Sequence, residues 1–95
     1  MPEIVIPTVH LNGTSSHDLI AQLHEAARAL SKAADALAKA APNARDYYPQ
    51  GEGVFEKAAA AYRDRIARIK SCYTEVSAIH EAVEEQVEAA KARKF

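Results

Sequence analysis

Residues 10–16, the N-terminal polar string, hold side chains that suit a ligand site: His10, Leu11, Asn12, Gly13, Thr14, Ser15 and Ser16. A glycine lets a ligand approach the backbone closely, and the free amides at the start of a helix attract anions. The string therefore predicts a site for an anion or another polar ligand, formed by His10, Asn12, Gly13, Thr14 and Ser15. An ordinary turn followed by a helix N-cap is the alternative interpretation. A P-loop is excluded, because its lysine and its longer glycine spacing are absent.

Residues 43–51, the loop string, carry more polar and aromatic side chains than a connection between helices needs. Tyrosine together with arginine can stack on planar groups and hydrogen-bond phosphates. The candidate ligand contacts in this string are Arg45, Tyr47, Tyr48 and Gln50. The alternative is a well-packed loop, in which one tyrosine caps the hairpin core and Asp46 pairs with Arg45.

The remaining reactive side chains favour neither a metal site nor catalysis. His17 and His24 are two helical turns apart, too far to share a zinc ion without further ligands. Ser16, His17 and Asp18 are consecutive, so on a helix they point in different directions and cannot form a catalytic triad. The single cysteine, Cys72, excludes a disulfide framework and a CxxC zinc site. We expect no enzymatic activity, no metal and no cofactor.

The first element that must position these residues is a helix over residues 16–41. Its small and apolar residues step by four and three in turn, which is helical spacing: Leu19, Leu23, Ala26, Leu30, Ala33, Leu37 and Ala40. Ser15 or Ser16 can cap its start, and Pro42 ends it because the residue before a proline disfavours the α region.

A second helix is predicted over residues 54–92, after a loop at 42–53. Its seam has the same spacing: Phe55, Ala58, Tyr62, Ile66, Ile69, Tyr73, Val76, His80, Val83, Val87 and Ala90. The two helices are expected to form an antiparallel hairpin, so the fold class is all-α. With residue 41 opposite residue 54, the start of the first helix lies opposite residues 76–83. His80 is then a further candidate ligand contact near residues 12–14, or else a hydrogen-bonded core histidine.

Residues 1–13 are predicted to form an extended arm. The β-branched run Ile4-Val5-Ile6 precedes Pro7, which removes a backbone donor and confines any strand to an edge or a terminus. Such an arm can cover its own hairpin or pair with the same arm in another subunit, and the sequence leaves both open.

The length and composition of the chain predict one domain with a small hydrophobic core. The 95 residues are 48% apolar, but 21 of them are alanines and none is a tryptophan. Small domains with little core need an additional source of stability. Because disulfides are excluded, we expect that source to be oligomerisation into a bundle of hairpins. A net charge of −1 argues against DNA binding. The sequence has no apolar run of the roughly 20 residues that a membrane span needs, and it has no recognisable secretory signal. We therefore expect a cytoplasmic protein.

The strings His10-Leu11-Asn12-Gly13-Thr14-Ser15 and Pro42–Gly51, with the helix between them, resemble a group of small uncharacterised proteins from bacteria, phages and prophages. The resemblance covers about residues 8–80. A position of the loop that is usually glycine-like in that group is Ala44 here. The resemblance implies a phage or prophage setting in a bacterial host cell, and it implies that the two strings form one site.

Two hypotheses follow for the function. The first is a non-enzymatic ligand-binding protein that sequesters a nucleotide-like, phosphate-bearing immune signal in a composite pocket of an oligomer. In an antiparallel dimer, the loop string of one subunit would meet the N-terminal polar string of the other. Alternatively, the arm runs back along its own hairpin, since about a dozen extended residues also span roughly 40 Å. The alternative is a structural or adaptor protein, which mediates protein–protein assembly through its helical seam and its acidic tail.

Overall fold

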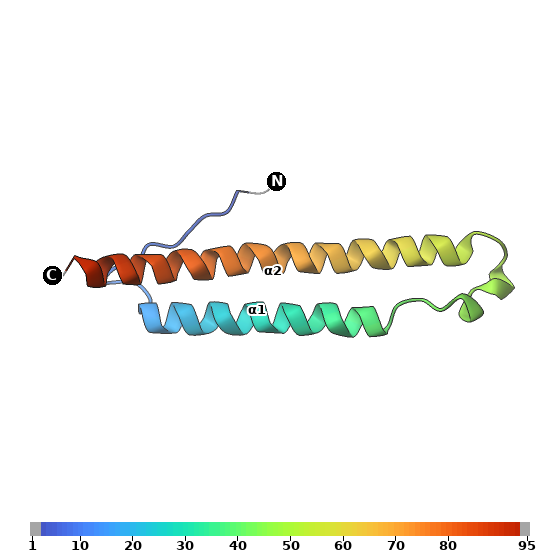
Figure 1. Cartoon of the computed structure of the whole chain (residues 1–95), viewed down its shortest axis with the longest axis horizontal. Helices are drawn as coiled ribbons and strands as arrows, with labels where there is room; N and C mark the ends of the chain where they lie inside the picture. Colours follow the sequence, from blue (N-terminus) through green and yellow to red (C-terminus); the bar gives the residue numbers. More distant parts are fainter. Residues whose placement is uncertain (1–2, 94–95) are drawn as a thin grey trace.

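Two antiparallel helices form the body of the fold (Figure 1). The computed structural model describes residues 3–93, so the first two residues of the predicted arm lie outside the described part. Helix α1 spans Ser16–Lys39 and helix α2 spans Val54–Ala92, and two 3-10 turns, η1 (Ala44–Asp46) and η2 (Tyr48–Gln50), lie between them. Residues 3–93 contain no strand. The all-α hairpin is therefore confirmed.

Local chemistry explains where the helices begin and end. The Ser15 hydroxyl accepts a hydrogen bond from the backbone N–H of Asp18 at 3.1 Å, so Ser15 is the N-cap of α1. Helix α1 ends at Lys39, two residues before the predicted boundary, because Pro42 constrains the residue before it and the last turn tightens ahead of it. Helix α2 begins after Gly53, whose φ of 81° is a left-handed conformation that suits glycine.

The face that α1 turns toward α2 differs in part from the predicted seam. Leu19, Leu23, Leu30, Ala33 and Leu37 are half-buried as predicted, Ala27 and the buried Ala34 join them, and Ala26 and Ala40 are exposed. The prediction followed a strict seven-residue repeat, which matches a helix only if the helix supercoils. A straight helix has 3.6 residues per turn, so after Leu23 the residue that faces α2 is Ala27 rather than Ala26.

The interior of the hairpin is thin. Within residues 3–93, only Ala34 and Val83 are buried, and Val83 is completely shielded from solvent. Most of the predicted α2 seam is half-buried, but Tyr73 and Ala90 are exposed. The chain measures 68 × 23 × 22 Å with a radius of gyration of 19.6 Å. A compact chain of this length would have a radius of gyration of about 12–13 Å, so this protein is a rod.

The register of the two helices also differs from the prediction. The rings of His24 and His80 lie 6.0 Å apart between centroids, and Leu37 lines the same groove as Ile69. The connection continues along the hairpin axis before it turns back, so the first turns of α2 run past the end of α1 (Figure 1). The prediction that residue 41 lies opposite residue 54 is therefore wrong.

The N-terminal arm packs on α2 of its own chain. The side-chain amide of Gln86 holds the arm by two hydrogen bonds, donating to the carbonyl of Pro7 at 2.7 Å and accepting from the N–H of Val9 at 2.9 Å. From there the arm runs toward the middle of the rod and rises away from α2 (Figure 1). Near Gln86 the arm therefore contacts its own hairpin, whereas Ile4, Val5 and Ile6 are exposed.

Candidate functional site

The N-terminal polar string forms a tight turn ahead of α1. The N–H of Gly13 donates to the carbonyl of His10 at 3.2 Å, and the His10 ring folds over the glycine. A Cβ atom at Gly13 would lie 2.8 Å from His10 Nε2, so the missing side chain makes room for the ring. Because Ser15 caps the helix, both Gly13 and Ser15 have structural roles here. Residues 10–15 are all exposed, which leaves the side chains of Asn12 and Thr14 open to solvent.

The loop string is built on the two 3-10 turns. The Asn43 side chain accepts from the N–H of Arg45 at 3.3 Å and so starts η1. The Tyr47 ring lies 6.5 Å from that of Phe55 and covers the end of the hairpin. The Tyr48 side chain, by contrast, is 76% exposed, and Arg45 and Gln50 are exposed as well. No ion pair joins Asp46 to Arg45 within residues 3–93.

The two strings lie at opposite ends of the rod (Figure 1). The arm does not bridge them, because it leaves the N-terminal polar string and runs only toward the middle of the rod. One chain by itself therefore keeps the two strings apart, and a single site made from both requires a second chain.

His80 lies apart from the N-terminal polar string, in contrast to the prediction. It faces His24, which lies about 12 Å along α1 from Ser16 at 1.5 Å per residue. Its Nδ1 atom is 3.3 Å from Glu84 Oε1, and its side chain is half-buried. His80 is thus a seam histidine with a carboxylate partner, and the observed register explains why it cannot reach residues 12–14.

The structure instead brings His80 into a polar pocket halfway along the hairpin. This mid-hairpin pocket has a volume of about 360 Å³ and is lined by His24, Ala27, Arg28, Ser31, Tyr73, Ser77 and His80. Its α1 residues follow one another at helical spacing, as do its α2 residues, so each set lies on one side of its helix. Sequence reasoning missed this pocket because it requires the correct register of α1 against α2.

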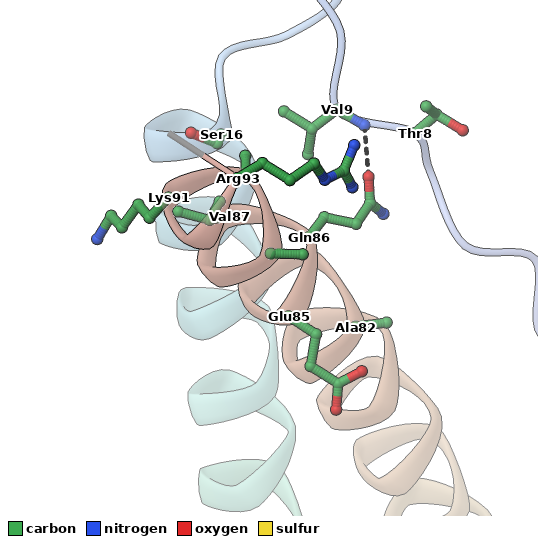
Figure 2. Close-up of a pocket in the computed structure, with 11 residues that line it drawn as sticks. Thr8, Val9, Ser16, Ala82, Glu85, Gln86, Val87, Lys91 and Arg93 are labelled. Carbon is green, nitrogen blue, oxygen red and sulfur yellow. Dashed lines mark hydrogen bonds between the residues drawn. The ribbon is translucent and has the colours of Figure 1, made fainter. Parts of the chain in front are cut away.

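A larger groove, the end groove, lies where the arm meets the last turns of α2. It has a volume of about 720 Å³, and its polar lining residues include Thr8, Ser16, Glu85, Gln86, Lys91 and Arg93. Figure 2 shows Gln86 reaching to Val9 across this groove, with the Arg93 side chain beside that hydrogen bond. The lining mixes cations with a carboxylate, and its central amide already binds the arm, so the groove offers fewer free groups than its volume suggests.

Residues 3–93 show no group of three or more His, Cys, Asp or Glu side chains placed to hold a metal ion. Neither described helix is apolar over a sufficient length to cross a bilayer. Comparison of the chain with protein-family models, with curated proteins and with solved structures finds no match.

Proposed function

We propose that this protein is a non-enzymatic module that works as an assembly of helical hairpins in the cytoplasm of a bacterial host cell. The observation that carries the proposal is the exposed area of the rod. The chain has an accessible surface of 7324 Å². A globular chain of 10.3 kDa would expose about 5,400 Å², so the hairpin exposes about 1,900 Å² more than a globular chain of its size.

This excess matches the requirement of a protein–protein interface. Stable interfaces bury about 800 Å² on each partner, and obligate ones bury more. The occupant that fits best is a second copy of the chain, because two hairpins packed side by side enclose seams that one hairpin leaves half-exposed. Exposed or half-buried apolar side chains, Ile4 and Val5 on the arm and Ile69 and Tyr73 on α2, supply such surfaces.

Within that assembly we propose a composite ligand site. An antiparallel pair of rods places the loop string of one subunit beside the N-terminal polar string of the other, which a single chain cannot do. The exposed Arg45 and Tyr48 would then face Asn12 and Thr14. Guanidinium, phenol, amide and hydroxyl groups together suit a phosphate-bearing, nucleotide-like molecule. With the resemblance to phage proteins, this supports sequestration of a nucleotide immune signal.

An adaptor role is the second candidate, and the C-terminal end of α2 favours it. The last turns of α2 project beyond the start of α1 (Figure 1). Their exposed side chains include Glu85 and Glu88, followed by Lys91 and Arg93. A projecting helix end with free charges can dock on a phage or host protein without any small ligand.

Solution mass tests the assembly. Light scattering coupled to gel filtration should give a mass of two chains or more, and the thermal midpoint should rise with protein concentration, because association stabilises the folded state. A mass of one chain at every concentration, with a concentration-independent midpoint, would contradict the proposal.

Thermal shift with a panel of nucleotides separates the two candidates. A ligand-binding assembly should be stabilised by at least one nucleotide through the composite site, and for that nucleotide Arg45→Ala and Tyr48→Ala should abolish the shift while Arg63→Ala, on the exposed face of α2, should keep it. An adaptor should show no shift that depends on Arg45 and Tyr48, and it should co-purify with a protein partner. Recovery of the nucleotide unchanged after incubation supports binding without catalysis, whereas turnover would contradict it.

A further inference from the structure

The mid-hairpin pocket collects hydrogen-bond donors from both helices. Helix α1 contributes the guanidinium of Arg28 and the hydroxyl of Ser31, and α2 contributes the hydroxyls of Tyr73 and Ser77. None of these hydroxyls donates to a protein atom within residues 3–93. The pocket therefore holds several donors that remain available to a ligand.

The charge of the pocket favours an anion. No carboxylate is among its lining residues, and Arg28 is its one permanent cation. The Arg28 guanidinium contacts Glu25 at 3.5 Å, but both side chains are more than half exposed, and exposed ion pairs contribute little. A phosphate can therefore replace Glu25 as the partner of Arg28, and it adds bidentate geometry that the carboxylate contact lacks.

The two imidazoles extend this donor set. His80 Nδ1 lies 3.3 Å from Glu84 Oε1, so the second ring nitrogen is left to the pocket. His24 lies across from it on α1, with a ring separation of 6.0 Å. A ring N–H of either histidine can donate to a phosphate oxygen.

The rim of the pocket suits a planar group. The Tyr73 side chain is 41% exposed, although its position in the sequence is on the predicted seam. Together with the exposed His24 it provides aromatic rings in a lining that also includes Ala27, Ser31 and Ser77, whose small side chains leave space for a ligand. A base that stacks on an aromatic side chain gains about 1–3 kcal/mol.

We propose that the mid-hairpin pocket binds a small phosphate ester that carries a planar aromatic group, such as a mononucleotide. Arg28, Ser31 and Ser77 hold the phosphate, and Tyr73 stacks on the ring. The volume of about 360 Å³ lies at the small end of ligand pockets, which fits one nucleotide rather than a larger molecule. This site needs one chain only, so it stands apart from the composite site at the ends of the rod.

Titration of the full chain with 5′-AMP, followed by two-dimensional NMR of the backbone amides, tests the proposal. The shifted amides should cluster at residues 24–31 and 73–80. Adenosine and inorganic phosphate, used as separate probes, should each bind at least tenfold more weakly than 5′-AMP, because each lacks half of the contacts. Shifts confined to residues 10–16 and 43–51, or no shifts at millimolar 5′-AMP, would overturn this assignment.

Two matched variants sharpen the test. Arg28→Ala should weaken 5′-AMP binding by tenfold or more, whereas Arg68→Ala, which removes another exposed arginine with its own carboxylate partner, should leave it unchanged. Tyr73→Phe should keep most of the affinity and Tyr73→Ala should lose it. Equal effects of Arg28→Ala and Arg68→Ala would indicate non-specific attraction and overturn the proposal. The solution mass, measured on the same samples, reports separately on the assembly.

Discussion

The ends of the hairpin and its middle use their polar side chains differently. At the ends, Ser15 and Asn43 accept hydrogen bonds from the backbone of their own turns, and Gly13 makes room for a ring. In the mid-hairpin pocket, Ser31 and Ser77 stand on continuous helices whose backbones are already satisfied. Polar residues clustered in sequence thus serve local structure first, whereas the hydroxyls of Ser31, Tyr73 and Ser77, which helix packing brings together, make no hydrogen bond within residues 3–93.

The largest effect is expected from a substitution in the buried part of the seam. Val83→Asp should lower the free energy of unfolding by about 3–5 kcal/mol, because it places an unpaired charge at a site with no solvent access. Urea unfolding followed by circular dichroism measures the change. Val5→Asp, on the exposed arm, is the matched control and should change the stability by less than about 0.5 kcal/mol. Equal effects would show that the hairpin has no distinct core.

Removal of the amide that holds the arm should have the next largest effect. Gln86→Ala deletes both hydrogen bonds to the arm, each worth about 1 kcal/mol, so the arm should be released while the helices persist. Amide hydrogen exchange at Val9 should accelerate by tenfold or more, with little change in global stability. Gln22→Ala, on the exposed face of α1, should leave that exchange rate unchanged. A Val9 amide that stays protected in Gln86→Ala would mean that other contacts hold the arm.

Loss of the N-cap of α1 should change the stability less, and its control substitution should change the stability in the opposite direction. Ser15→Ala removes the acceptor for the Asp18 amide and should destabilise the protein by about 1 kcal/mol. Ser71→Ala, at an exposed position inside α2, should stabilise it slightly, since alanine is the better helix former. Thermal unfolding distinguishes the two signs, and a Ser15→Ala variant as stable as the parent would remove the structural role given to Ser15.

The smallest effect is expected at the turn of the N-terminal polar string. Gly13→Ala should displace the His10 ring at a cost below about 1 kcal/mol, because the clashing atom is the end of a flexible side chain. The NMR signals of the His10 ring should shift. In a His10→Ala background the same glycine substitution should have no cost. A cost that persists there would mean that the backbone, rather than the ring, requires glycine.

The sequence by itself determined the helices and their caps. Helical spacing, Ser15, Pro42 and Gly53 act over a few residues, so the bounds of α1 and α2 lie within two residues of those expected. The tertiary structure alone decided the facing line through Ala27 and Ala34, the register that pairs His24 with His80, and the hold of Gln86 on the arm. These features depend on helix twist and on the path of the connection. Both result from small backbone angles that accumulate over many residues, so a short sequence pattern does not define them. The mid-hairpin pocket is a product of that register, which is why its residues, apart from His80, were not recognised as a site from the sequence.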